Sequence, residues 1–151
     1  MSQFDPDAFM SAPTSEAGST TFAPVPTGEY TAIIEDVAKP RSAGERVVMD
    51  VTFKMVNVDQ KVLDSVGRAV LNVKKGYFLD LTPENRLDMS KGKNIDLNRL
   101  REAVGQNVAG KPWTVMDLKG AGPLKVVVSH RTPKDGPSDV IYSDIRSVAK
   151  L

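Results

Sequence analysis

The feature that most constrains the fold is a run of alternating apolar and polar residues, RVVMDVTFKMVNV, at residues 46–58. Positions 47, 49, 51, 53 and 55 are apolar, whereas Asp50, Thr52 and Lys54 lie between them. A period of two places successive side chains on opposite faces of an extended chain. The run therefore predicts a β-strand that packs one face on a core and exposes the other to water.

Other segments of the chain have the composition of strands, and one has the spacing of an amphipathic helix. Leu97, Leu100 and Val104 recur at positions i, i+3 and i+7, and Gly105 is a natural helix end. The expected strands are residues 28–39, 46–58, 68–81, 124–131 and 140–148. The expected helices are residues 95–106 and a shorter one at 112–120, and the expected loops and turns are residues 40–45, 59–67, 82–93 and 132–139.

The order of these elements is three strands, a helical region and two strands. It is the order of an OB-fold, a five-stranded Greek-key barrel with a helix between strands 3 and 4. We therefore expect residues 28–151 to form one mainly β, OB-fold-like domain, since 151 residues are too few for two full domains. An α+β sheet with a different strand pairing is the alternative.

Residues 1–27 differ from the rest of the chain. They are rich in Ser, Thr, Pro, Ala and Gly and contain no Lys or Arg. Such a segment buries too little apolar surface to offset its loss of conformational entropy, so we expect a flexible acidic arm. Within it, FDPDAFM predicts one helical turn with Asp5 as N-cap and Pro6 at the first helical position. The arm is either a plain linker or a peptide that docks on a partner protein or on the domain's own basic face.

Composition excludes several classes of protein. The chain has no cysteine, which removes disulfides, thiolate nucleophiles and cysteine-based metal sites and suits a reducing cytosol. No apolar run approaches the roughly 18 residues of a membrane span. The N-terminus carries Asp5 and Asp7 where a signal peptide would be basic. We therefore expect a soluble, cytoplasmic protein without a membrane partner.

The charge of the chain is unevenly distributed, although the formal net charge is only +1. The net charge is −5 over residues 1–60, +4 over residues 61–101 and +2 over residues 102–151. A local basic excess attracts anionic partners even when the total charge is close to zero. The middle of the chain is therefore the place to look for an anion-binding surface.

The sequence carries no pattern that indicates catalysis. The single histidine, His130, lies in the apolar segment VVVSHR without a nucleophile beside it, which favours a structural role. GAG at residues 120–122 and GKP at residues 110–112 lack the remainder of a dinucleotide- or phosphate-binding loop. No cluster of His, Cys or carboxylates has the spacing of metal ligands. We therefore expect no enzyme activity, no metal and no cofactor.

The third expected strand contains NVKKGYFLDL, an unusual composition for a core strand. Strict alternation would put Lys75 and Tyr77 on the core face and Lys74 and Phe78 on the opposite face. A bulge at Gly76 would instead turn both lysines and an aromatic ring outward. Proteins that bind single-stranded nucleic acid combine cations for the phosphates with aromatic platforms for the bases. Lys74, Lys75, Tyr77 and Phe78 are therefore candidates for such contacts. The alternative is an edge strand that lysines protect, with both rings in the core.

Basic residues elsewhere complete the candidate interface. Two are expected beside the lysine pair, two flank the loop between the first two strands, which is a contact loop in OB-folds, and two lie in the glycine-bearing loop SKGKN. These residues are, in the same order, Lys54 and Arg68, Arg41 and Arg46, and Lys91 and Lys93. Each of them is otherwise an ordinary solvated charge. By contrast, we expect Arg101 to be an ordinary surface residue of the helix and Trp113 to be buried.

The chain as a whole resembles a known family. An MSQF-type arm rich in Ser and Thr precedes VPTGEYTAIIEDV, and a leucine-bearing helix, GKPW, LKGAGPLKVVVSHR and YSDIRSVAKL follow in that order. Over about residues 22–151 these segments are similar to the small single-stranded DNA-binding proteins that tailed phages encode. The resemblance implies an OB-fold. It also implies sequence-tolerant binding and protection of single-stranded DNA during phage DNA replication or recombination in the host cytoplasm.

The chain departs from bacterial-type single-strand binders at its C-terminal end. Those proteins usually end in an acidic tail that recruits partners, whereas this sequence ends with Arg146, Lys150 and Leu151. The acidic N-terminal segment is therefore the candidate for recruiting replication or recombination proteins.

Two alternative functions belong to other classes of protein. One is a phage structural or assembly protein, a β-domain of the virion that uses the arm to bind its neighbours. The other is an accessory protein-binding module whose lysines only protect a strand edge. Salt dependence separates DNA binding from both, because binding to DNA releases counterions and weakens steeply as salt is added.

Overall fold

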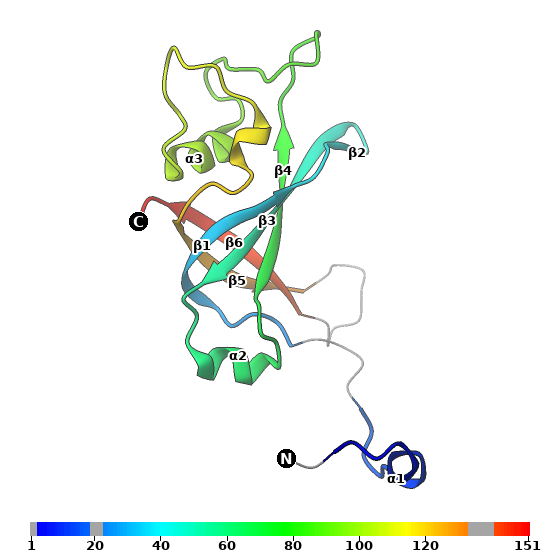
Figure 1. Ribbon diagram of the computed structural model, residues 1–151. Helices are drawn as coiled ribbons and strands as arrows, with labels where there is room; N and C mark the ends of the chain where they lie inside the picture. The colour runs from blue at the N-terminus through cyan, green and yellow to red at the C-terminus, as the bar shows by residue number, and fades with distance from the viewer. Residues whose placement is uncertain (1–2, 19–22, 133–140) are drawn as a thin grey trace.

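The computed structural model describes residues 3–18, 23–132 and 141–151, which form a mainly β protein. Its helices are α1 (Pro6–Ser11), α2 (Gln60–Val66), α3 (Ile95–Ala103) and the 3-10 helix η1 (Val115–Leu118). Its strands are β1 (Gly28–Val37), β2 (Arg41–Ala43), β3 (Arg46–Val56), β4 (Asn72–Leu79), β5 (Leu124–Arg131) and β6 (Tyr142–Ala149). Figure 1 shows the sheet at the centre of the domain, with α3 and its neighbouring loops at one end and α2 at the other.

The six strands form one antiparallel sheet. β3 pairs with β4 along one edge and with β1 and β2 along the other. β5 pairs with β1, and β6 pairs with β5. Among the described residues no backbone ladder joins β4 to β6, so the sheet is not closed into a barrel. The prediction of a mainly β domain is confirmed, whereas the five-stranded OB-type barrel is not.

The edges of β4 and β6 meet through a side chain instead of a backbone ladder. The two strands lie close together, and the ammonium group of Lys75 on β4 donates a hydrogen bond of 3.2 Å to the backbone carbonyl of Ile145 on β6. A charged side chain at a strand edge discourages further strand pairing. We call this junction the β4–β6 seam.

The core lies between the inner face of the sheet and the segments around α3. The alternation predicted for β3 is confirmed from residue 49 onward, because Met49, Val51, Phe53 and Met55 are all buried. At the start of the strand Val47 is only half-buried, whereas Val48 is buried. α3 contributes Leu97 and Leu100 to the same cluster, as its spacing predicts, and η1 contributes Leu118. Burial of these large apolar side chains is the main favourable contribution to the stability of such a domain.

Arg101 on α3 is buried, so its assignment to the surface is wrong. Its guanidinium group lies 4.2 Å from the centre of the Trp113 ring, and its Nη2 donates to the carbonyl of Gln106. The indole Nε1 of Trp113, a half-buried residue, donates to Oε1 of Gln106 at 2.8 Å. The flat guanidinium group can stack on the ring while its stem covers apolar surface. Burial lowers the pKa of Arg101.

Two short elements lie where loops are expected. β2 forms because Gly44, with φ 66°, lets the chain turn back and pair Ala43 with Arg46. α2 begins after Asp59, whose carboxylate accepts from the backbone N–H of Lys61, and ends at Gly67, whose φ is 68°. Local capping of this kind stabilises a short helix, and Val66 anchors α2 to the core.

Two predicted helices can be compared directly with the structure. The turn expected around Asp5 is present as α1, with the Asp5 carboxylate accepting from two backbone N–H groups and Pro6 at the first helical position. The helix expected at residues 112–120 is only the 3-10 turn η1, and Trp113 precedes it. The turn expected at residues 132–139 lies, except for its first residue, outside the described part of the chain.

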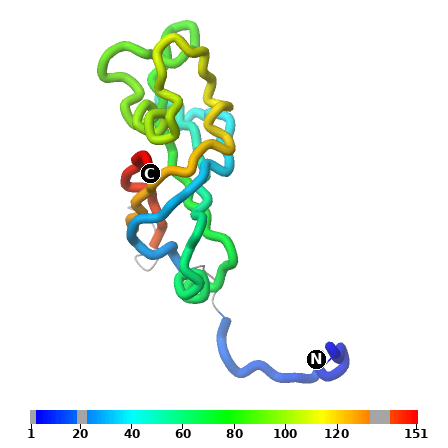
Figure 2. Tube along the Cα trace, turned by 60° about the vertical axis from the view of Figure 1, so that its left-hand side comes forward, coloured from blue at the N-terminus to red at the C-terminus, as the bar shows by residue number. Residues whose placement is uncertain are grey.

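The chain just before β1 packs against the domain. Val25 is buried, and its backbone N–H donates to Oγ of Ser143 at 2.7 Å. The Nε2–H of His130 donates to the carbonyl of Val25, and Nη2 of Arg68 donates to the carbonyl of Ala23 at 2.7 Å. By contrast, α1 has no buried residue, and Figures 1 and 2 show it standing apart from the sheet. The histidine therefore has a structural partner, and the arm is attached to the domain at residues 23–25.

Asn94 organises the long connection between β4 and α3. Its side chain is buried and accepts from the backbone N–H of Asp80 at 2.9 Å. The amide group of the same side chain donates to the carbonyls of Asp80 and Asp88 at 2.9 and 3.0 Å. The backbone of Asn94 has φ 52°, a left-handed conformation that Asn tolerates better than most residues. One side chain thus connects both ends of the loop.

We predict that Asn94→Ala lowers the free energy of unfolding by about 2–4 kcal/mol, because it removes three buried hydrogen bonds and strains a left-handed backbone. Urea denaturation followed by circular dichroism measures the change. Asn85→Ala is the matched control, since Asn85 also has a left-handed backbone (φ 62°) but is exposed. It should cost only about 1 kcal/mol. Equal losses in both variants would contradict a role for the side-chain hydrogen bonds.

Candidate nucleic-acid interface

β4 alternates without interruption between the core and the solvent. Val73 and Tyr77 are buried, whereas Lys74, Gly76 and Phe78 are exposed on the opposite side, which we call the outer face. The ladder between β3 and β4 has no register shift, so the bulge predicted at residue 76 is absent and that prediction is wrong. The face of each side chain on β4 is therefore set by simple alternation.

Gly76 does not form a bulge; it allows side chains of β3 to pack closely against the backbone of β4. A Cβ atom at this position would lie 3.0 Å from Cγ2 of Val48 and 3.4 Å from a carboxylate oxygen of Asp50 on the adjacent strand. The absence of a side chain therefore lets two β3 side chains lie over the middle of β4. It also leaves a depression in the outer face between Lys74 and Phe78.

Tyr77 is withdrawn from the interface because it belongs to the core. Only 2% of its surface is exposed, so its ring cannot stack on a base. Its hydroxyl is buried without a hydrogen-bond partner in the described residues. Burial, together with the nearby carboxylate of Asp96, raises the pKa of Tyr77. Phe78, which is 49% exposed, remains as the aromatic candidate on β4.

Lys75 lies on the inner side of β4 but reaches the surface at the β4–β6 seam. It is half-buried, and its ammonium group lies 5.5 Å from the centre of the Tyr77 ring. It lines a small cavity of about 80 Å³ on the α3 side of the seam and also an open groove on the outer face. The structure therefore keeps Lys75 at the edge of the interface, in a role that includes bonding to β6.

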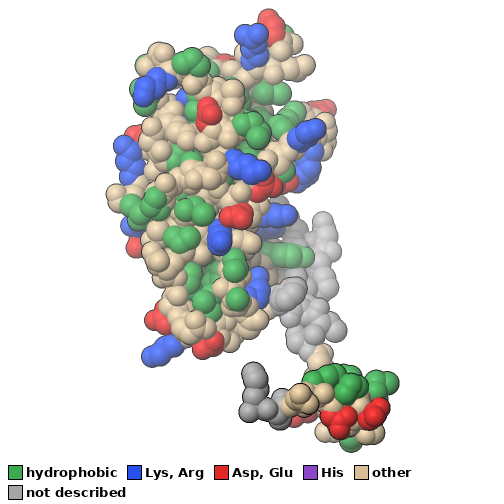
Figure 3. Space-filling model, viewed as in Figure 1, with side chains coloured by type: hydrophobic (Ala, Val, Ile, Leu, Met, Phe, Trp, Pro, Cys, Tyr) green, Lys and Arg blue, Asp and Glu red, His purple; other side chains and the backbone are tan. Residues whose placement is uncertain are grey.

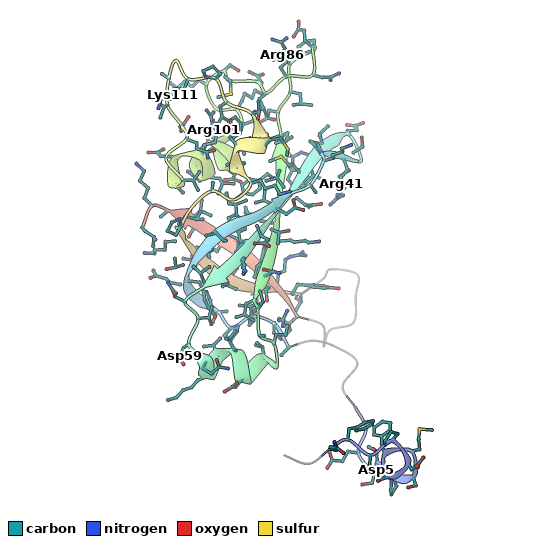
Figure 4. The ribbon with its side chains drawn as sticks, viewed as in Figure 1. Asp5, Arg41, Asp59, Arg86, Arg101 and Lys111 are labelled. Carbon is teal, nitrogen blue, oxygen red and sulfur yellow. The ribbon has the colours of Figure 1, made fainter. Side chains whose placement is uncertain are left out.

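The groove next to Phe78 has a volume of about 420 Å³, and we call it the Phe78 groove. Its lining includes Arg41, Val48, Asp50, Gly76, Phe78 and Arg131. The Arg41 side chain, which Figure 4 shows on β2, forms an ion pair of 3.0 Å with Asp50 across the groove. The guanidinium group of Arg46 lies 4.0 Å from the centre of the Phe78 ring. Both arginines predicted to flank the loop between the first two expected strands thus reach the outer face.

A second groove of about 610 Å³ continues along β4 toward α2, and we call it the Lys74 groove. Its lining includes Ala23, Arg68, Asn72, Lys74, Arg131 and Tyr142. Arg131 lines both grooves, so they are adjacent on the outer face. Together the two linings contain five cationic side chains and two carboxylates. Figure 3 shows a mixed distribution of charge over the visible face of the domain.

Lys54 and Lys74 are the cations of the outer face that are best placed to meet phosphates. The β3–β4 register pairs Thr52 with Lys74 and Lys54 with Asn72, so the two lysines lie diagonally on the same face. Neither forms an ion pair with a carboxylate within the described part of the chain. Arg68 lies beside them but is engaged with the carbonyl of Ala23.

Lys91 and Lys93 do not join the other candidates. Both are exposed in the connection between β4 and α3, whose tip Figure 4 marks with Arg86. Neither lines the Phe78 groove or the Lys74 groove. They remain solvated charges at the end of the molecule beyond β4.

The structure adds Arg131 and Tyr142, which the sequence analysis does not single out. They are paired at the end of the β5–β6 ladder, and the guanidinium group of Arg131 lies 5.4 Å from the centre of the Tyr142 ring. Tyr142 is 46% exposed and lines the Lys74 groove, which makes it a second candidate platform on the outer face. The sequence predicts that these two residues lie near the ends of two strands joined by a turn. It does not predict that β6 lies beside β4, which is what brings them to the outer face.

Comparisons with protein-family models, with curated proteins and with solved structures found no match for this chain. No described helix is long and apolar enough to cross a membrane. Within the described residues, no group of three or more His, Cys, Asp or Glu side chains is arranged to hold a metal ion. The outer face itself is therefore the feature of this molecule that points to a function.

We predict that Tyr77 contributes to a loss of stability at alkaline pH. Because its pKa is raised in the folded protein, its stabilising effect is complete below about pH 10, the pKa of an unfolded tyrosine, and is lost as the pH rises further. Tyr77→Phe should make the pH dependence shallower by up to about 1.4 kcal/mol per pH unit. Urea unfolding between about pH 9 and 11 tests this expectation. A slope in Tyr77→Phe equal to that of the unsubstituted protein would refute the prediction.

Proposed function

We propose that this protein binds single-stranded DNA, without strong sequence preference, along the outer face of β3 and β4. The observation that carries the proposal is the pairing of exposed aromatic rings with cations along two adjacent grooves. Phe78 with Arg46 lies beside the Phe78 groove, and Tyr142 with Arg131 lies beside the Lys74 groove, where Arg131 borders both grooves. Lys74 and Lys54 lie on the same face, without a carboxylate partner among the described residues.

This arrangement matches the chemistry of a single nucleic acid strand. Its bases offer flat faces that stack on aromatic rings, and its phosphates attract cations at regular intervals. A duplex hides the base faces, so exposed rings favour single strands. β4 is roughly 25 Å long at about 3.3 Å per residue, which accommodates a short run of nucleotides. Stacking and phosphate contacts do not read the edges of the bases, which accounts for sequence tolerance.

The strand order is compatible with an OB-like origin of this surface. If β2 is treated as part of the connection, β1, β3, β4, β5 and β6 correspond to five strands in chain order, with α3 between the third and fourth. In an OB-fold, the surface of strands 2 and 3 binds oligonucleotides. The corresponding strands here are β3 and β4. We further propose that the protein acts without catalysis or a cofactor, and that it protects DNA during phage replication or recombination, as the resemblance implies.

We predict tight binding of a labelled oligo-dT of about 30 nucleotides and weak binding of a duplex of the same length, both measured by fluorescence anisotropy. If three to five phosphates are neutralised, log K should fall against log salt with a slope of about −2 to −3.5. Absence of binding at about 50 mM salt would refute DNA binding. That result would favour the two alternatives, a protein-binding module whose lysines protect a strand edge or a phage structural or assembly protein.

We predict that Phe78→Ala weakens single-strand binding by about 5- to 150-fold, the value of one stacked base. Lys74→Ala should also weaken binding, by a smaller factor at high salt than at low salt. It should make the slope of log K against log salt shallower by about 0.7. Lys111→Ala is the matched control, because Figure 4 shows this exposed lysine in the loop after α3, away from β2 and Arg41. Equal effects of the two lysine variants would place the interface elsewhere.

A further inference from the structure

α1 is a helix whose side chains are not used by the rest of the structure. It has six residues and no buried one, although isolated helices of this length are not stable in water. Phe4, Phe9 and Met10 are 65–80% exposed, and the two phenylalanine rings lie 5.8 Å apart. Such a cluster of large apolar side chains is stabilised when a partner surface covers it. The folded helix therefore indicates a binding segment.

The charge of the arm defines the kind of surface that α1 fits. Residues 1–27 contain Asp5, Asp7 and Glu16 and no Lys or Arg. Figure 3 shows hydrophobic and acidic side chains side by side on α1. A complementary surface must therefore offer cations together with apolar or aromatic side chains. The outer face has this composition, with Phe78, Tyr142 and an excess of Lys and Arg along the two grooves.

The arm is attached to the domain inside one of these grooves. Ala23 lines the Lys74 groove together with Lys74, and Arg68 holds the carbonyl of Ala23 at 2.7 Å. Eleven residues separate Ser11, the end of α1, from this anchor at Ala23, and the connection spans at most about 40 Å. A segment tethered at this distance is present at an effective concentration on the order of millimolar. Even weak intrinsic affinity would therefore populate a docked state.

We propose that α1 docks on the outer face of its own chain and competes with single-stranded DNA. The acidic side chains then take the positions of the DNA phosphates beside the Lys and Arg side chains, and the phenylalanine rings cover the aromatic platforms. The competition rests on the proposed DNA binding, whereas docking of α1 does not. A ligand that presents many phosphates and bases at once can displace the docked α1. A short or weakly binding anionic ligand displaces it less readily.

The first test measures docking without DNA. The chain has no cysteine, so Ala12→Cys, just after α1, accepts a single spin label in the full-length protein. At low salt we expect line broadening at the backbone amides of Lys74, Gly76 and Phe78, and none at Leu97 in α3. Broadening should disappear at about 0.5 M salt, where charges are screened within about 4 Å. Absence of broadening at low salt would overturn the proposal.

The same label identifies the occupant of the groove. A mixture of spin-labelled, isotopically unlabelled chains and label-free, ¹⁵N-labelled chains should show no broadening, because docking is intramolecular. Broadening in the mixture would overturn this arrangement in favour of a second copy of the chain.

The second test measures competition through DNA affinity. Asp5→Asn/Asp7→Asn removes two charges, while Asn keeps the helix cap. We expect it to raise affinity for oligo-dT about three- to tenfold at low salt, as does Phe4→Ala/Phe9→Ala. The control Glu84→Gln/Glu102→Gln changes the net charge equally at exposed sites outside the arm and should have a smaller effect. Equal gains from both charge variants would overturn the competition.

The two tests separate the two proposals. Spin-label broadening without any DNA binding would leave docking of α1 intact and refute the proposed function. DNA binding without broadening, and without a gain in the arm variants, would leave the function intact and refute docking.

Discussion

The candidate interface depends on the uninterrupted ladder between β3 and β4. Because its register does not shift, Lys74 and Phe78 face outward and Tyr77 is locked in the core. A slip of one residue would exchange these faces and place the ring of Tyr77 in water. Close packing of Val48 and Asp50 over Gly76 supports the same register, since only glycine fits without displacing them.

Much of the architecture follows from the sequence because the signals are local. Alternation in residues 46–58, the leucine spacing of α3 and the capping pattern at Asp5 each predict an element that the structure contains. Face assignment on β4 also follows from alternation once the bulge is set aside. For the site, alternation correctly places Lys74 and Phe78 on the outer face. The expectation that Tyr77 contacts a ligand is not supported, because its ring is buried.

The remaining features could not be predicted because they depend on contacts between distant segments. Arg101 looks like a solvated charge until Trp113 from a later loop stacks on it. Arg131 and Tyr142 reach the interface only because β6 lies close to β4 at the seam. The strands are joined there by the hydrogen bond from Lys75 to β6 and not by a backbone ladder. No periodicity in a single sequence records which two edges of a sheet will meet.

The setting of Trp113 determines what its fluorescence can report. It is the single tryptophan of the chain, and its ring is held by Arg101 and Gln106 beside α3. It lines neither of the two outer-face grooves. Its emission is therefore an intrinsic spectroscopic probe for the packing of the α3 region during unfolding. Because the ring lies away from the two grooves, we expect its emission to change little when a ligand binds on β4. Binding to that face is therefore better followed with a label on the ligand.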